Sequence, residues 1–115
     1  MRILVVEDNS EAQSALCELL ELLDYQALGV ANAEEALDKF PHFDILLTDI
    51  NLPGISGIEL ARKCNTMDPA KPIIITSGMD ISTQFQFEVQ MLPKPFSVTK
   101  LSEILERAKN LVRPA

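Results

Sequence analysis

Short apolar runs alternate with longer amphipathic segments along this chain of 115 residues. Four runs rich in β-branched residues or leucine, at residues 3–6, 25–30, 44–48 and 73–76, are bounded by turn-forming residues, a pattern typical of buried strands. A fifth run, residues 91–96, is expected to complete the sheet. The chain is therefore predicted to contain five short strands, each followed by a longer connection.

The longer segments between the runs have apolar residues at helical spacing. The first helix is expected to have Asn9 or Ser10 as its N-cap, and later helices are expected to start at Asn32 and Ser56, because these side chains accept hydrogen bonds from free amides at helix starts. A last helix is expected over residues 98–111. This alternation predicts the α/β class, with a flavodoxin-like, doubly wound, five-stranded parallel sheet of order 2-1-3-4-5.

The segment at residues 78–90 departs from the alternation. Apolar and polar residues alternate one by one at its end, and the apolar ones are Phe85, Phe87, Val89 and Met91. This alternation follows the period of a strand and not that of a helix. Ser82 and Thr83 add little helix propensity. We predict that the fourth helix is short or absent, replaced by a loop that Phe85 or Phe87 pins to the core.

Composition restricts the class of protein. A hydrophobic fraction of 47% and a charged fraction of 23% fit one soluble globular domain over residues 1–115. The net charge of −7 argues against direct binding of nucleic acid. No apolar segment approaches the roughly 20 residues of a membrane span, so no membrane insertion is expected. Cys17 and Cys64 form no motif, and a cytoplasmic location is predicted.

Every polar residue of chemical interest directly follows a predicted strand. Glu7 and Asp8 follow the first strand, Asp49 the third, Ser77 the fourth and Lys94 the fifth, so all are expected at one edge of the sheet. Asp49 taken alone could simply start the turn at Pro53-Gly54. Three neighbouring carboxylates stay ionised only beside a cation, and oxygen ligands suit Mg²⁺.

This set of groups points to phosphoryl chemistry. A lysine ammonium, a serine hydroxyl and a metal ion could together bind phosphoryl oxygens. A carboxylate beside them can itself take up the phosphoryl group, which would give an aspartyl phosphate on Asp49. The sequence contains no glycine-rich phosphate loop, which argues against P-loop nucleotide hydrolases and dinucleotide enzymes.

Four motifs in order resemble the receiver domain of two-component response regulators across the whole chain. They are Glu7-Asp8-Asn9 after two valines, the block at residues 49–57, the strand ending in Ser77-Gly78, and Lys94-Pro95-Phe96. The resemblance implies that Asp49 is the phosphoacceptor and that Lys94 and Ser77 bind the phosphoryl group. It further implies that Mg²⁺ is held by Asp8, Asp49 and the backbone carbonyl of Asn51, with Glu7 acting through water.

The resemblance also implies a partner and a type of activity. A histidine kinase or a histidine phosphotransfer protein would supply the phosphoryl group, and the domain would act as a signalling switch and not as a turnover enzyme. The sequence leaves open whether the chain is a stand-alone regulator or part of a hybrid kinase or larger regulator. Receivers commonly have a cis peptide bond after the lysine, so Lys94-Pro95 is predicted to be cis.

Two departures from the family pattern leave alternatives. Met91 stands where receivers usually have an aromatic residue, and the stretch from Ser77 to Lys94 is short, which puts the usual output face in doubt. A receiver-like docking module that works independently of phosphorylation is one alternative. An unrelated doubly wound enzyme, such as a flavin binder, is the other.

Overall fold

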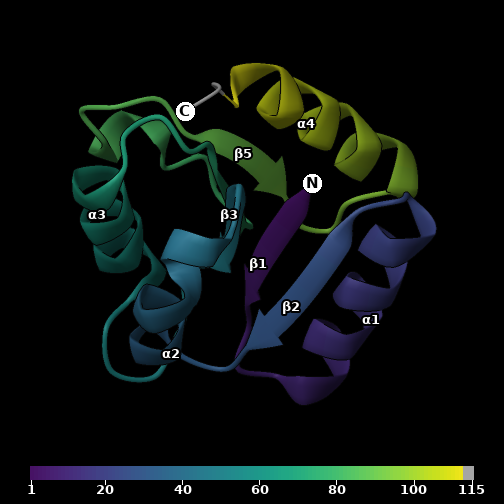
Figure 1. The fold of residues 1–115 in the computed structure, drawn as a ribbon, viewed down its shortest axis with the longest axis horizontal. Coiled ribbons are helices and arrows are strands. Elements are labelled where there is room, and N and C mark those ends of the chain that lie inside the picture. The colour runs from purple at the N-terminus through teal and green to yellow at the C-terminus, as the bar shows by residue number, and fades with distance from the viewer. Residues whose placement is uncertain (113–115) are drawn as a thin grey trace.

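Five parallel strands form one sheet in the order β2-β1-β3-β4-β5 in the computed structural model, which describes residues 1–112 (Figure 1). The strands are β1 Arg2–Val6, β2 Gln26–Val30, β3 Ile45–Asp49, β4 Ile73–Ser77 and β5 Gln90–Pro93. This order confirms the predicted flavodoxin-like arrangement. Because β1 and β3 are neighbours, residues that follow them in the chain meet at the same edge of the sheet.

Four α-helices surround the sheet. They are α1 Ser10–Leu22, α2 Ala33–Lys39, α3 Gly57–Met67 and α4 Val98–Leu111. The predicted N-caps are confirmed, with Asn9 and not Ser10 capping α1: its side-chain oxygen accepts from the Ala12 amide at 2.9 Å. Asn32 caps α2 and Ser56 caps α3 in the same way. A short 3₁₀ turn, η1 Phe40–His42, leads from α2 toward β3.

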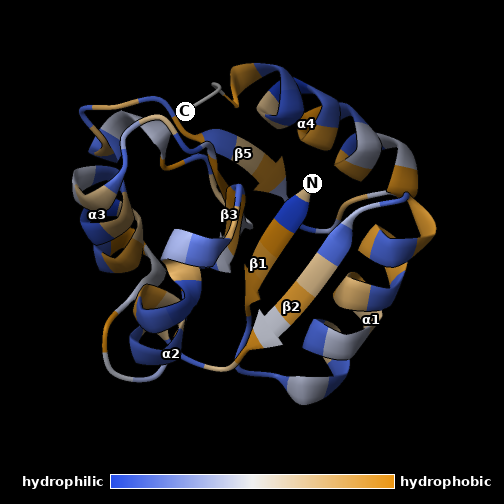
Figure 2. Cartoon of the chain, in the orientation of Figure 1, coloured by the Kyte–Doolittle hydropathy of each residue, from blue (hydrophilic) through white to orange (hydrophobic). Residues whose placement is uncertain are grey.

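Alternate strand residues build two separate cores. Leu4 and Val6 face α2 and α3, whereas Ile3 and Val5 face α1 and α4, since successive strand side chains point to opposite faces. Figure 1 shows the two helix pairs on the two sides of the sheet, and Figure 2 shows hydrophobic residues gathered on the strands and striped along the helices. Burial on both faces explains the nearly continuous apolar character of β1, β3 and β4.

The connection between β4 and β5 contains no α-helix, as predicted. Its one helical turn within the described chain is the 3₁₀ turn η2 Ser82–Gln84. Phe85 follows it and is buried in the core on the α3 side, with the Phe87 ring 5.2 Å away. Arg62 of α3 lies over the Phe85 ring at 6.0 Å and donates to the Gln84 carbonyl at 3.3 Å. Aromatic side chains thus cover the place of the missing helix.

The residues after this connection follow the remaining expectations. Met91 is half-buried against the core on the α3 side. The Lys94-Pro95 bond is cis, which confirms the prediction. Phe96 packs partly against the core on the α1 and α4 side. Within residues 1–112, no helix combines the length and apolar character needed to cross a membrane.

Candidate functional site

Three carboxylates meet at the carboxyl edge of the sheet. β1 pairs with β3 in parallel, with Val6 opposite Thr48, so the residues that follow Val6 lie beside Asp49. One carboxylate oxygen from each of Glu7, Asp8 and Asp49 lies within 4.8 Å of the other two. The predicted convergence of these acids is therefore confirmed. Such a cluster attracts a cation, because like charges at this distance repel one another.

Asp49 is held from two sides. It is the last residue of β3, and its side chain is only 13% exposed. One carboxylate oxygen accepts a hydrogen bond from the Ile50 amide at 2.8 Å, and the other lies 3.2 Å from the Lys94 ammonium. The Lys94 side chain is 42% exposed, so this ion pair borders on solvent. The carboxylate is thus oriented by a backbone amide and paired with a cation.

Glu7 supplies an oxygen that is buried without a partner. Among the described residues, nothing forms a hydrogen bond with its buried Oε2 atom. Burial, and next the contact with the Asp49 carboxyl, raises the pKa of Glu7 from 4.5 to about 7, against the lowering effect of Lys94. An unpartnered buried oxygen in an all-oxygen donor set fits a hard divalent ion such as Mg²⁺. The site residues therefore fit the predicted metal.

The raised pKa of Glu7 predicts how stability depends on pH when no metal is added. The folded chain keeps the Glu7 proton up to about pH 7, whereas the unfolded chain loses it near 4.5. The stability that Glu7 contributes is complete below 4.5 and is lost as pH rises through about 7. Urea unfolding in EDTA over this range should show this decline, and Glu7→Gln should remove it. Glu18→Gln, an exposed control on α1, should keep it; an identical pH dependence in the Glu7 variant contradicts the assignment.

Ser77 lies at the same edge but does not bond to Asp49. It ends β4 and is 7% exposed; its hydroxyl oxygen accepts from the Met79 amide at 3.0 Å. Its carbonyl accepts from the Lys94 amide at 2.8 Å, which links the ends of β4 and β5. Asn51, two residues beyond Asp49, is exposed, and within the described chain its carbonyl accepts no hydrogen bond from another site residue. The structure thus brings together Glu7, Asp8, Asp49 and Lys94, with Ser77 and Asn51 beside them.

Gly57 ends the motif at residues 49–57, but sequence reasoning gave it no role at the site. Its amide donates to the Ile50 carbonyl at 2.8 Å, which closes the loop after β3. A Cβ atom at this position would overlap the Asp49 carbonyl oxygen, so only glycine allows this close approach. The sequence did contain one sign of this role, because a glycine stands directly after the Ser56 cap, at the start of a helix. Gly57 thereby fixes the backbone on which Asp49 stands.

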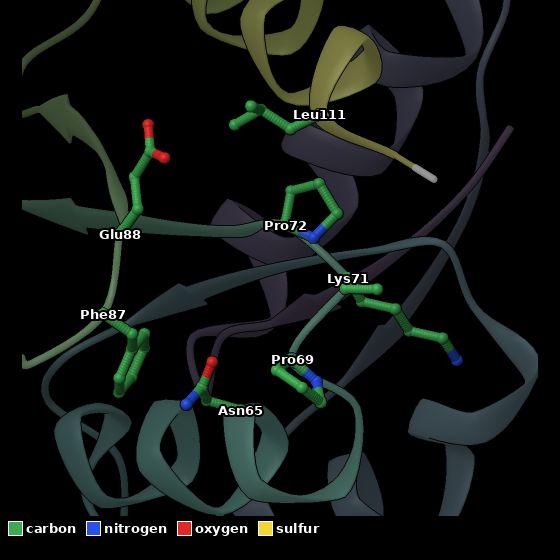
Figure 3. Close-up of a pocket in the computed structure, with 8 residues that line it drawn as sticks. Asn65, Pro69, Lys71, Pro72, Phe87, Glu88 and Leu111 are labelled. Atoms are coloured by element: carbon green, nitrogen blue, oxygen red, sulfur yellow. The ribbon is translucent and has the colours of Figure 1, made fainter. Parts of the chain in front are cut away.

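A cavity lies at the opposite edge of the sheet from the carboxylates, and Figure 3 shows the residues around it. It is lined by Asn65, Pro69, Ala70, Lys71, Pro72, Phe87, Glu88 and Leu111. The Lys71 side chain extends away from the cavity (Figure 3), and its ammonium donates to the Phe40 and Pro41 carbonyls at 3.2 and 3.1 Å. This lysine serves the fold, and the cavity gathers no set of reactive groups comparable with the acidic edge.

The chain is thus a doubly wound parallel sheet with a carboxylate cluster and a lysine at its carboxyl edge, the edge at which open α/β sheets bind ligands. The family model of the response regulator receiver domain matches residues 3–106. The chain therefore belongs to this family, as its motifs indicated. The fold, with its sheet order 2-1-3-4-5, agrees with that membership.

Individual relatives give the same result. The response regulator receiver protein CpdR of Brucella abortus is 30% identical over an alignment 113 residues long, and the match covers 92% of this chain and 94% of CpdR. A receiver domain protein of Clostridium thermocellum superposes with a TM-score of 0.87 at 26% identity, covering 95% of this chain and 94% of that one. TrrA of Thermotoga maritima, solved in complex with Mg²⁺-BeF, has a TM-score of 0.83 at 29% identity, with 93% and 97% covered.

The chain corresponds to nearly all of one curated relative and to a smaller part of others. The chain spans 94% of the length of CpdR but between 22% and 58% of four other curated relatives that it matches. Receiver domains related to this chain thus occur both nearly alone and as parts of longer proteins.

Proposed function

We propose that this receiver domain accepts a phosphoryl group on Asp49 from a phosphohistidine of a histidine kinase or a histidine phosphotransfer protein. The observation that carries the proposal is the Asp49 carboxylate, held 3.2 Å from the Lys94 ammonium and beside Glu7 and Asp8. Family membership supports it, since receivers belong to two-component signalling. The 13% exposure of the Asp49 side chain leaves a narrow approach for a phosphohistidine.

The proposed reaction is an in-line transfer. A carboxylate oxygen of Asp49 attacks phosphorus, the P–N bond breaks, and the imidazole nitrogen leaves with the electron pair. The Ile50 amide holds the carboxylate in orientation, and the Lys94 ammonium balances charge on the phosphoryl oxygens. The Ser77 hydroxyl, now accepting from Met79, can donate its own hydrogen to a phosphoryl oxygen. The product is an acyl phosphate on Asp49.

The residues that would hold Mg²⁺ are Asp8, Asp49 and the Asn51 carbonyl, with Glu7 acting through water. When bound, Mg²⁺ would neutralise negative charge on the phosphoryl oxygens. The complex of the related TrrA with Mg²⁺-BeF supports this choice of ion. The buried, unpartnered Glu7 oxygen supports it independently, because a water molecule bound to a metal could donate to this oxygen.

We further propose that the domain is a cytoplasmic signalling switch and not a turnover enzyme. Its chemistry is limited to its own phosphorylation and dephosphorylation, and its effect comes from altered partner binding. The net charge of −7 supports a protein partner over nucleic acid. The domain would act either alone, over nearly the length of a CpdR-like protein, or within a hybrid kinase or larger regulator.

Direct phosphorylation tests the proposal. The chain is incubated with phosphoramidate, a phosphoryl donor that needs no kinase, in Mg²⁺ or in EDTA, and the intact mass is measured. We expect one phosphate adduct in Mg²⁺ and almost none in EDTA, because the crowded carboxylates then repel the donor. Peptide mapping should place the adduct on Asp49. Failure to form an adduct in Mg²⁺ would remove the phosphoacceptor function.

One alternative has specific support. The missing helix between β4 and β5 and the presence of Met91 remove parts of the usual output face, which favours docking that does not depend on phosphorylation. A docking module has no need to keep three carboxylates within 4.8 Å of one another, and this observation favours the phosphoacceptor. A partner that binds equally well before and after adduct formation would support the alternative.

A further inference from the structure

We infer that Gln13 is a positioning residue that fixes Glu7 and Asp8 for metal binding, and that Gly29 exists to make room for it. The inference rests on the proposed Mg²⁺ site. Gln13 belongs to α1 and touches neither Asp49 nor Lys94 through any hydrogen bond of the described chain. We therefore infer that Gln13 acts on the metal site indirectly, through the backbone of the turn that joins β1 to α1.

Gln13 holds this turn at two points. Its side-chain amide donates to the Glu7 carbonyl at 2.9 Å, and its backbone amide donates to the Asn9 carbonyl at 2.9 Å. The Glu7 amide donates to the Val30 carbonyl of β2 at 3.0 Å. Both polar backbone groups of Glu7 are thus satisfied, one by β2 and one by α1. Without the Gln13 side chain, the carbonyl would lose its partner, and the peptide plane between Glu7 and Asp8 could turn more freely about the backbone bonds on either side of it.

Asp8 depends on this backbone because its side chain has no other support. It is exposed, and among residues 1–112 no side-chain hydrogen bond or ion pair holds its carboxylate. The position of the Asp8 carboxylate beside Glu7 and Asp49 therefore follows from the backbone of the turn. Groups behind the ligands of a metal typically affect affinity by orienting those ligands.

Gly29 provides the path for the Gln13 side chain. A Cβ atom built on Gly29 would lie 2.6 Å from both Cγ and Cδ of Gln13, and closer still to Oε1. Such distances force one partner to move, and the flexible glutamine is the one that can. The glutamine therefore crosses β2 directly above this glycine on its way to Glu7. A glycine within a strand often marks a place where another group approaches the backbone closely.

The experiment measures the dissociation constant of Mg²⁺ by calorimetry on the whole chain. Gln13→Met keeps the length of the side chain but removes the donor, and Gly29→Ala displaces an unchanged glutamine. Each variant should weaken Mg²⁺ binding by roughly 3- to 10-fold, the loss expected for one hydrogen bond. The double variant should be no weaker than the worse single variant, because both remove the same contact.

Controls separate positioning from general loss of structure. Gln26→Met makes the same change at an exposed glutamine of β2 and should leave the affinity unchanged. Asp8→Ala, which removes a proposed ligand, should abolish binding. Thermal unfolding in EDTA confirms that each variant is folded at the temperature of the titration. Affinity equal to wild type in Gln13→Met, or losses that add in the double variant, would overturn the inference.

The outcome also distinguishes this inference from the proposed function. A wild-type chain that binds no Mg²⁺ would overturn the metal site, whatever Gln13 does. Hydrogen exchange at the Glu7 amide, which donates to the Val30 carbonyl and so reports how firmly the turn is held, then tests the role of Gln13 without metal. Faster exchange in Gln13→Met than in Gln26→Met supports the role of Gln13 in fixing the turn, and equal exchange overturns it. If wild type binds Mg²⁺ and Gln13→Met binds it equally, only the role of Gln13 fails.

Discussion

Asp49→Asn is expected to abolish the phosphate adduct that wild type forms with phosphoramidate and Mg²⁺. The amide is nearly the same size as the carboxylate but is far less nucleophilic, so no acyl phosphate forms. The variant also loses a proposed metal ligand and the 3.2 Å ion pair with Lys94. Intact-mass spectrometry at equal protein and donor concentrations measures the result. The expected effect is loss of the adduct to the detection limit.

Asp38→Asn is the matched control, since Asp38 is an exposed acid on α2, away from the acidic edge. Its adduct yield should equal that of wild type. An adduct that persists in Asp49→Asn would show that another side chain takes the phosphoryl group, and Asp49 would lose its proposed role. If both variants and wild type remain unlabelled while a partner still binds them, the phosphorylation-independent docking module becomes the better description.

The part of the site that could be predicted from the sequence is the set of residues at or just after the ends of strands. A parallel sheet brings the carboxyl ends of its strands to one edge, so locating the strands was enough to bring Asp8, Asp49 and Lys94 together. The same reasoning placed Ser77 at that edge. It could not foresee that the Ser77 hydroxyl bonds to the Met79 amide, because the path of a loop depends on local turns.

Side-chain environments were not predictable in the same way. The burial of one Glu7 oxygen depends on the packing of neighbouring elements, and the pKa of about 7 follows from that burial. The link from Gln13 to Glu7 depends on a glycine sixteen residues further along the chain, which no periodicity reveals. The absent helix was predictable because it has a local cause: an alternating apolar pattern with poor helix formers.

Phe85→Ala is expected to destabilise the chain by about 3 kcal/mol, the lower end of the range for phenylalanine in a core. Phe85 is 8% exposed and packs against the core where a helix would otherwise lie. The lower end applies because the loop around it can relax into part of the cavity. Urea unfolding in EDTA gives the free energy of unfolding of each variant. Loss of the Arg62 and Phe87 contacts adds to the effect.

Phe87→Ala is the matched control, since the same substitution is made two residues away at a half-buried ring. Its cost should be about 1 kcal/mol, in proportion to the smaller buried area. Because Asp49 stands on β3 and not on this loop, the Phe85 variant should still form the phosphate adduct while it is folded. Equal costs for the two variants would show that Phe85 does not pin the segment, and the loop would then need another explanation for its place on the sheet.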